Sequence, residues 1–144
     1  MKFSRIRTLF FLHLQHLPMP STKWRPLIVK WGGVNVKSYK TTFIGEGVVF
    51  DTNYPEDIEI DDACITTGCI LLTHFRETEK KQYTRGKIVI KRGAYIGCNT
   101  IICKPVTIGE NAVVGAGSIV TKNIPANQVW AGNPARYIKD IGYK

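Results

Sequence analysis

The chain has 144 residues, enough for one domain, and its hydrophobic content of 44% is ordinary for a globular protein. Its 20 Lys and Arg residues outnumber 11 Asp and Glu residues, which gives a net charge of +9. This charge predicts an anionic partner, such as a phosphate-bearing ligand or an acidic membrane surface. The basic residues are scattered and accompany no nucleic-acid-binding motif, so the composition argues against a nucleic-acid partner.

The first 17 residues are basic and carry apolar residues at spacings that suit one helical face: Phe3, Ile6, Leu9, Phe10, Leu14 and Leu17. Their longest uncharged stretch is far shorter than the ~20 residues that span a bilayer. No small-residue cleavage site of a signal peptide follows it. We expect residues 1–32 to form a helical segment that caps the rest of the domain. Peripheral contact with a membrane is the less favoured alternative.

The second half of the chain repeats with a period of six. Aliphatic residues recur at this spacing six times in succession: Ile90, Ile96, Ile102, Ile108, Val114 and Val120. The period fits neither an α-helix nor an isolated strand. It fits a solenoid in which each short strand supplies one wall of a coil, with roughly 18 residues in a three-walled coil.

Two further positions keep the same period. The fourth residue after each aliphatic one is mostly small or β-branched, as suits a tight corner: Ala94, Thr100, Val106, Ala112, Ser118 and Ile124. Gly97, Gly109 and Gly115 directly follow their aliphatic residues. Glycine is expected where the chain turns with positive φ or where another backbone comes close. The core is therefore predicted to be a stack of side chains.

The period continues towards the N-terminus at five more positions: Leu72, Thr66, Ile60, Phe50 and Ile44. Two interruptions break the count, one at residues 53–57 and a longer one at residues 73–87. Because the repeats of a solenoid contact only their neighbours, extra residues leave the stack as loops, and such loops collect function. We expect the chemistry at these interruptions.

The most specific motifs are Ile108-Gly-Glu-Asn-Ala-Val-Val-Gly-Ala-Gly-Ser-Ile-Val-Thr-Lys-Asn-Ile-Pro and Ala131-Gly-Asn-Pro-Ala-Arg136. With them, residues 33–140 resemble the hexapeptide-repeat acyltransferases. The segments Phe50-Asp-Thr-Asn-Tyr-Pro and Leu72-Thr-His-Phe75 are most similar to sugar and polysaccharide O-acetyltransferases. The resemblance implies an all-β fold: a left-handed parallel β-helix over residues 33–130, a protruding loop at 73–87 and a C-terminal tail at 131–144.

The resemblance also implies a reaction, the direct transfer of an acetyl group from acetyl-CoA to a hydroxyl of a sugar or polysaccharide precursor. His74 matches the family's catalytic histidine, and imidazole, with a pKa near ~6.5, can take the proton of a hydroxyl during attack. No cysteine needs to be a nucleophile. Asp51 and Asn53 are the candidates for the group that holds His74 or binds the acceptor hydroxyl. Either residue alternatively forms a turn.

By the same resemblance, the cofactor residues are Gly97, Cys98, Ala116, Thr121, Lys122 and Arg136. Lys122 and Arg136 lie on the phosphate side, and the amide of Cys98 stabilises the oxyanion. Tyr95 lines the acceptor or pantetheine site, or packs against a neighbouring subunit. Arg76 is assigned to the acceptor, because in trimeric relatives this loop reaches over the neighbouring subunit's site. We therefore expect a homotrimer.

Other classes of function were weighed. An N-acetyltransferase acting on an amino sugar competes most closely, since a similar base serves both reactions. A catalytically silent scaffold is a further alternative. A zinc-dependent carbonic anhydrase needs three histidines and the repeats supply only His74, so no metal is expected. The four cysteines form no Cys-x-x-Cys pair, which favours reduced thiols and a cytoplasmic protein.

Overall fold

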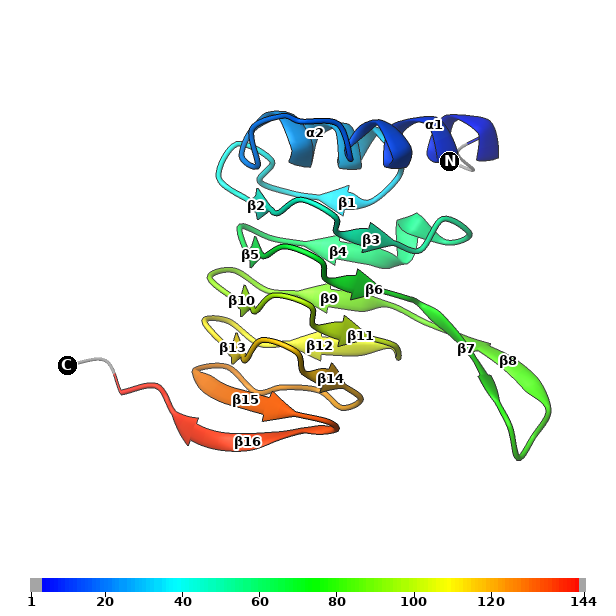
Figure 1. The fold of residues 1–144 in the computed structure, drawn as a ribbon. Helices are drawn as coiled ribbons and strands as arrows, with labels where there is room; N and C mark the ends of the chain where they lie inside the picture. Colours follow the sequence, from blue (N-terminus) through cyan, green and yellow to red (C-terminus); the bar gives the residue numbers. More distant parts are fainter. Residues whose placement is uncertain (1–3, 143–144) are drawn as a thin grey trace.

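A computed structural model describes residues 4–142. They form a left-handed parallel β-helix with a layer of two helices at one end and a hairpin that projects from its side (Figure 1). Apart from these two additions the chain consists of short strands joined by tight turns. The predicted fold class is confirmed.

Three sheets form the walls of the coil. Wall 1 contains β1 (Asn35–Val36), β4 (Ile58–Ile60), β9 (Ile88–Ile90) and β12 (Val106–Ile108). Wall 2 contains β2 (Phe43–Ile44), β5 (Cys64–Ile65), β10 (Tyr95–Ile96), β13 (Val113–Val114), β15 (Gln128–Gly132) and β16 (Ala135–Asp140). Wall 3 contains β3 (Val49–Phe50), β6 (Ile70–Leu71), β11 (Ile101–Ile102) and β14 (Ile119–Val120).

The core is a stack of aliphatic side chains that point inward from the three walls. Residues of successive coils pair in register, in three stacks: Ile60, Ile90 and Ile108; Ile65, Ile96 and Val114; Leu71, Ile102 and Val120. All nine side chains are fully buried. The six residues that define the sequence period therefore point inward, as predicted.

The prediction for Thr66 and Leu72 is wrong by one residue. Both are only partly buried, and the inward positions belong to Ile65 and Leu71. The physical reason lies in the turn after Ile60: the next inward position, Ile65, comes five residues later, whereas six residues separate the inward positions at the equivalent turns after Ile90 and Ile108. A shift of one residue in a strand exchanges its inner and outer faces.

The six corner residues are buried as predicted, at 0–4% exposed. In the coil of Ile65 and Leu71, where the register is shifted by one residue, the corresponding corner residues are Ala63 and Cys69. The period of six would have placed Cys64 at this corner. Gly109 is needed for close approach of two coils. A Cβ atom there would lie 2.6 Å from the carbonyl carbon of Pro125 and would also contact the backbone of Ala126.

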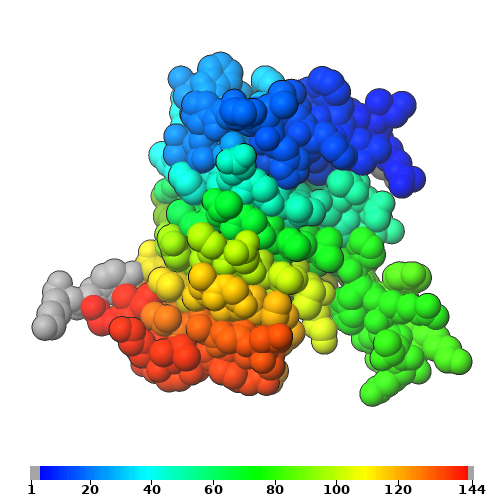
Figure 2. Space-filling view, viewed as in Figure 1, coloured from blue at the N-terminus to red at the C-terminus, as the bar shows by residue number. Residues whose placement is uncertain are grey.

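Both interruptions of the period leave the coil at one corner. The first forms a short 3-10 helix, η1 (Pro55–Asp57). The second, expected as a loop, is an antiparallel hairpin of β7 (His74–Glu77) and β8 (Gln82–Arg85). Figure 2 shows this green hairpin standing clear of the body of the molecule.

The C-terminal segment is also more ordered than expected. Residues 131–144 were predicted to be a tail, yet β15 continues to Gly132 and β16 returns antiparallel to it, so the end of the coil is closed by a strand pair. The predicted boundary after residue 130 therefore falls inside a strand. The reason is that β15 extends wall 2 by pairing with β13, and its outer edge is then covered by β16.

At the other end of the coil lie α1 (Arg5–Leu14) and α2 (Trp24–Trp31). Arg25 of α2 is 2% exposed and ties this layer together. Its guanidinium donates to the carbonyl oxygens of Gln15 (3.0 Å), Met19 (3.1 Å) and Ile44 (3.0 Å). Neither helix is long and apolar enough to cross a bilayer, and the same holds for every helix within residues 4–142.

The helical segment was predicted to pack through Ile6, Leu9, Phe10, Leu14 and Leu17, and this prediction is wrong. The side chains of α1 that face the coil are Thr8, Leu12 and Gln15, while Ile6 and Phe10 are 80% and 60% exposed. Phe3 lies outside the described residues. The coil offers α1 polar partners at its open edge, including the Val48 carbonyl that accepts a hydrogen bond from Gln15 (2.9 Å), so a mixed face of the helix docks there.

Gly109→Ala is expected to lower the free energy of unfolding by about 1–3 kcal/mol, because the added methyl group overpacks against the backbone of the next coil. Urea denaturation of the two proteins measures the difference. Gly142→Ala is the matched control, since a Cβ atom at Gly142 meets nothing within 4 Å. Equal losses in the two variants would contradict the role of close approach.

Candidate active site at the insertion corner

The two insertions pack against each other through Arg85, which lies at the base of the hairpin. Its guanidinium pairs with the carboxylates of Glu56 (2.9 Å) and Asp57 in η1. In the hairpin register Arg85 lies opposite His74, and the carbonyl of Thr73 accepts a hydrogen bond from the amide of Gly86 (3.0 Å). His74 is thus held at the point where the chain leaves the coil.

His74 is hydrogen-bonded to Asp51, which follows β3 one coil earlier. The distance from Nδ1 of His74 to Oδ2 of Asp51 is 2.6 Å. An ionised carboxylate only accepts hydrogen bonds, so Nδ1 carries the proton and Nε2 is left as the proton acceptor. The His74 side chain is 28% exposed, whereas Asp51 is 2% exposed. The arrangement is that of a buried carboxylate orienting a solvent-accessible imidazole.

Four more donors satisfy the Asp51 carboxylate. Thr73 donates from its backbone amide (3.0 Å) and from its hydroxyl (2.8 Å), both to Oδ2, and the amides of Asn53 (2.9 Å) and Tyr54 (3.4 Å) donate to Oδ1. Burial by itself raises the pKa of Asp51, but the hydrogen bonds from Thr73, Asn53 and His74 outweigh it and leave the pKa below its ordinary value. The carboxylate is therefore ionised at neutral pH.

An aromatic contact supports the imidazole from the side. The rings of Tyr54 and His74 meet edge to face with their centroids 5.4 Å apart, and the guanidinium of Arg85 lies 3.9 Å from the centre of the Tyr54 ring. Arg85 therefore contacts Tyr54, and Tyr54 contacts the imidazole of His74, so both insertions support that ring.

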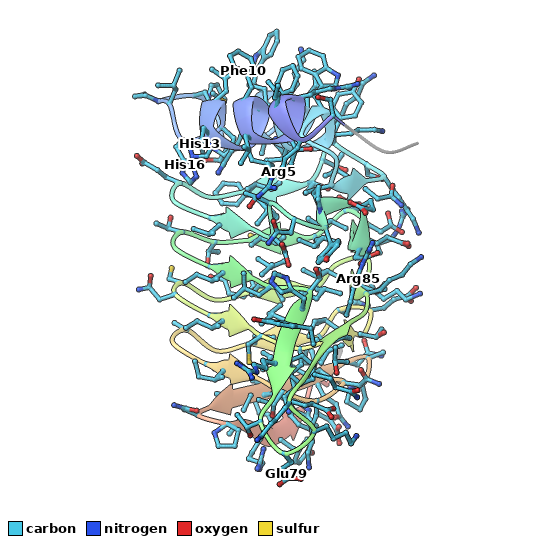
Figure 3. The ribbon with its side chains drawn as sticks, turned by 90° about the vertical axis from the view of Figure 1, so that its right-hand side faces the viewer. Arg5, Phe10, His13, His16, Glu79 and Arg85 are labelled. Atoms are coloured by element: carbon cyan, nitrogen blue, oxygen red, sulfur yellow. The ribbon has the colours of Figure 1, made fainter. Side chains whose placement is uncertain are left out.

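Beside this group lies a cavity of about 470 Å³, lined by Arg5, Thr8, Thr52, Asn53, Tyr54, Pro55, Glu56 and Arg85. Its lining is largely polar and includes cationic groups from α1 and from the hairpin. Figure 3 shows Arg5 pointing from α1 towards the coil, on the side where Arg85 lies. His74 itself does not line the cavity, which adjoins the site through Asn53, Tyr54 and Arg85. A cavity of this size is suited to a polar small molecule.

A second cavity, of about 340 Å³, lies under the hairpin. Arg76, Phe75 and Lys104 line it together with residues 77–80, and the ammonium group of Lys104 lies 5.2 Å from the centre of the Phe75 ring. Arg76 is thus placed near a cavity, on the opposite side of the hairpin base from the first one.

Five of the six predicted cofactor residues fall at two different corners of the coil. Gly97, Cys98 and Ala116 lie between walls 2 and 3, where the carbonyl of Cys98 accepts a hydrogen bond from Gly117 (2.7 Å). A Cβ atom at Gly97 would contact the backbone of Ala116 (2.5 Å to its amide nitrogen). These residues therefore stack on neighbouring coils.

Lys122 lies at the other corner, after β14, at the same edge of wall 3 as His74. The register that pairs Leu71 with Ile102 and Ile102 with Val120 places Lys122 two coils beyond Thr73, roughly 10 Å along the stack at ~4.8 Å per strand. Thr121 immediately precedes Lys122. Both lie on the side of the coil to which the hairpin is attached.

The last two predicted residues are set apart from these corners. Tyr95 points outward from wall 2 and is 42% exposed. Arg136 lies on β16, is exposed, and donates a hydrogen bond to the carbonyl of Ala135 (3.0 Å). Within residues 4–142 no group of three His, Cys, Asp or Glu side chains could hold a metal ion, and the four cysteines are unpaired.

Sequence analysis missed Thr73, Tyr54 and Arg85 as members of the site. Thr73 and Tyr54 stand inside the two segments that first suggested a sugar acetyltransferase, so their position at the interruptions was the available signal. Nothing in the sequence marked Arg85, because its role depends on the hairpin register. Asn53 reaches the site through its backbone amide, while its side chain lines the larger cavity.

Comparison with known proteins places these features in a family. Residues 87–122 match the family model described as bacterial transferase hexapeptide (six repeats). The chain is 54% identical over 54 residues to galactoside O-acetyltransferase of Escherichia coli K12, covering 38% of this chain and 27% of that protein. It is 51% identical over 51 residues to dTDP-3-amino-3,6-dideoxy-alpha-D-galactopyranose 3-N-acetyltransferase of Aneurinibacillus thermoaerophilus, covering 35% and 27%. The chain thus spans about a quarter of the length of each relative.

Among solved structures, a galactoside acetyltransferase in complex with coenzyme A is 26% identical with a TM-score of 0.66, covering 96% of this chain and 80% of that one. The fold and the repeat define a left-handed β-helix protein of the hexapeptide type. In sequence and fold the chain is similar to hexapeptide-repeat acyltransferases.

Asp51→Asn is expected to destabilise the protein in a pH-dependent way. The pKa of Asp51 is lowered in the folded state, so its contribution to stability is present above the unfolded pKa of about 4 and is lost as pH falls below that value. Urea denaturation should therefore show a larger difference between wild type and variant at pH 7 than at pH 3. Asp140→Asn, on the exposed strand β16, is the control and should show little difference at either pH. A difference for Asp51→Asn that does not change between these pH values would contradict this assignment.

Proposed function

We propose that the protein is an acetyl-CoA-dependent O-acetyltransferase that acetylates a hydroxyl group of a sugar or polysaccharide precursor, with His74 as general base. The observation that carries the proposal is the 2.6 Å contact between His74 and a buried, fully hydrogen-bonded Asp51 beside a polar cavity. The relatives named above support a sugar acceptor and coenzyme A as the acyl carrier.

The proposed reaction is a single transfer. Nε2 of His74 takes the proton of the acceptor hydroxyl as its oxygen attacks the thioester carbonyl carbon. The negative charge that develops on the carbonyl oxygen is stabilised by the amide of Cys98. The C–S bond then breaks, CoA leaves as the thiolate, and the imidazolium returns a proton to it. Asp51 keeps the imidazole in the tautomer that this sequence of steps requires.

Such a site needs more than one copy of the chain. In one copy, His74 and the Cys98 amide lie at opposite edges of wall 3. About six residues of extended chain separate them, or roughly 20 Å at ~3.3 Å per residue. A thioester carbonyl cannot contact groups so far apart. In a homotrimer, the His74 corner of one copy can face the Cys98 corner of the next. This arrangement brings His74 and the Cys98 amide together and places acetyl-CoA in the cleft between the coils.

The outward surface of the walls supports this assembly. The outward residues of wall 3 are Val49, Ile70, Ile101 and Ile119, all aliphatic, and Val49 is 42% exposed. By contrast, the outward residues of wall 1 are Asn35, Glu59, Val89 and Thr107, which are mostly polar. Wall 2 is also apolar on its outer side, through Phe43, Cys64, Tyr95 and Val113, so walls 2 and 3 are the ones that an assembly would cover.

Lys122 and Arg136 are assigned to the phosphates of CoA, and the cavity of about 470 Å³ to the acceptor. Tyr95, outward on wall 2, would face the cleft between copies. A cytoplasmic location accompanies this proposal, since four unpaired cysteines suit a reducing compartment. Acetylation of an amino sugar is the second candidate, because the N-acetyltransferase relative matches as strongly as the O-acetyltransferase.

His74→Ala is expected to lower acceptor-dependent release of thiol from acetyl-CoA at least ~10²-fold, because it removes the general base. A panel of sugars, amino sugars, serine and nucleotide sugars identifies the acceptor and separates the two candidates. His13→Ala, an exposed histidine in α1, is the matched control and should leave the rate unchanged. Unchanged turnover in His74→Ala would show that His74 is not the general base. If the wild type neither acetylates any acceptor nor binds CoA in calorimetry, the result would favour a non-catalytic scaffold.

Ile101→Lys is expected to convert the assembly to monomers, because it places a charge in the centre of wall 3. Light scattering measures the mass, and circular dichroism checks that the coil remains folded. The separated chains should lose transferase activity, since each holds only part of the site. Val89→Lys, the equivalent position of wall 1 beside Glu59, is the control and should stay trimeric. A wild-type mass of one chain at micromolar concentration would contradict the shared site.

A further inference from the structure

The outer face of the helical layer exposes large apolar side chains. In α1 the exposed residues are Ile6 (80%) and Phe10 (60%), and in α2 they are Trp24 (52%) and Trp31 (44%). Figure 3 shows Phe10 at the top of the molecule, pointing away from the coil, whereas Arg5 on the same helix points towards it. We call this face the cap surface and define it as Ile6, Leu9, Phe10, Leu17, Trp24 and Trp31.

The cap surface is continuous across both helices. The rings of Phe10 and Phe11 meet edge to face at 5.2 Å, and Phe11 meets Trp31 at 5.6 Å. These residues cannot turn inward to join the core, because Thr8, Leu12 and Gln15 already occupy the inner side of α1 and the buried Arg25 fixes α2. The apolar groups are therefore held in solvent by the fold itself.

The positive charge of the protein is concentrated in the same segment. The first 45 residues contain eight of the 20 Lys and Arg residues and none of the 11 Asp and Glu residues, so they account for +8 of the net charge of +9. Lys23 and Lys30 of this segment are exposed, and the ammonium group of Lys23 lies 5.9 Å from the Trp24 ring. The rest of the chain is close to neutral.

We infer that the cap surface docks on an anionic lipid bilayer. Exposed Trp, Phe and Ile side chains enter the boundary between headgroups and acyl chains, while neighbouring Lys and Arg side chains bind the anionic headgroups. Lys23 lies beside Trp24 of the cap surface, and no acidic residue occurs in the first 45 positions. The sequence alone favoured a capping segment over membrane contact, because the apolar face of the first helix was expected to be buried against the coil. The structure exposes that face, so membrane contact is now the preferred inference.

A second copy of the chain suits this surface less well. Two caps packed face to face would bring together two segments that contain basic but no acidic residues, and like charges repel. The lateral packing proposed above uses the walls of the coil, so it leaves the end of the stack uncovered. In a trimer whose coils run parallel, the three cap surfaces would face one plane, as a flat bilayer requires.

Docking would also set the position of the larger cavity. Arg5 and Thr8 of α1 line that cavity, while Ile6 and Phe10 of the same helix belong to the cap surface. A docked protein therefore holds the cavity within one helix diameter of the membrane, about 10 Å. The docking inference does not rest on the proposed acetyl transfer, and the experiment below measures no activity.

The test measures binding of the full chain to vesicles of phosphatidylcholine with about 30% phosphatidylglycerol, and to vesicles of phosphatidylcholine alone, by flotation. We expect binding to the anionic vesicles that falls as NaCl is raised, and at least tenfold weaker binding to the neutral ones. In a Trp130→Phe variant the remaining tryptophans are Trp24 and Trp31, and their fluorescence emission should shift to shorter wavelength on addition of anionic vesicles.

Paired variants separate the two components of the surface. Ile6→Asn with Phe10→Asn should weaken vesicle binding about tenfold or more, whereas Ile138→Asn, 56% exposed at the other end of the coil, should have no effect. Lys23→Gln with Lys30→Gln should also weaken it about tenfold, whereas Lys80→Gln with Lys81→Gln at the tip of the hairpin should not. All the substituted residues are exposed, and circular dichroism confirms folding.

Several results would overturn the inference. One is an absence of binding to anionic vesicles by wild type, and another is equal binding by the cap variants and their controls. A third is self-association in light scattering that disappears in Ile6→Asn with Phe10→Asn while vesicles are not bound, which would assign the cap surface to a second copy.

Discussion

The structure depends on the inward stacking of one aliphatic side chain for every wall of every coil. Because neighbouring coils lie only ~4.8 Å apart, each buried side chain packs against those directly above and below it. Ile96, for example, lies between Ile65 and Val114 and is completely buried. This stack leaves no room for a binding pocket in the interior, and buried polar side chains such as Thr100, Ser118 and Asp51 lie at the corners. Everything that binds or reacts must therefore be added at the corners, on the walls or at the ends.

The corner between walls 3 and 1 shows how such an addition becomes a site. Two insertions leave the coil there, and each would be a solvated loop on its own. Arg85 joins them by pairing with Glu56 and Asp57 and by stacking on Tyr54. His74 is fixed between that contact and the buried Asp51. The rigid coil provides the position of the carboxylate, and the insertions provide the imidazole and the polar cavity.

The two ends of the coil are closed by different means, and the difference has consequences for binding. At the C-terminal end β16 covers the last strand by backbone hydrogen bonds, and its outer side chains are mixed in character. At the N-terminal end two helices cover the first coil through a mixed polar and apolar face anchored by Arg25. Several of their large apolar residues are left on the outside, in a segment that contains basic but no acidic residues. The N-terminal end of the molecule is thus suited to contact with a membrane surface, and the walls are suited to packing against other copies of the chain.

The sequence by itself determined the coil. A six-residue period of aliphatic residues, with small residues and glycines at fixed offsets, is a local property of the chain and predicts which side chains point inward wherever the turns have equal length. The period failed at Thr66 and Leu72, because one turn is a residue shorter and the pattern does not measure turn length. His74 was assigned because it matches the catalytic histidine of the resembled family, and Asp51 was one of two candidates beside the first interruption of the count. Their hydrogen bond was not predictable from spacing, since it joins residues of different coils.

Only the tertiary structure decided the rest. Arg85 lies opposite His74 through a hairpin register that the polar loop sequence does not specify. The exposure of Ile6 and Phe10 depends on which face of α1 the coil accepts, and helical periodicity identifies an apolar face without saying what it will contact. The separation of His74 from Cys98 across wall 3 follows from the geometry of the coil. Local pattern fixes an element and its inner face, whereas contacts between distant segments depend on how the whole stack brings them together.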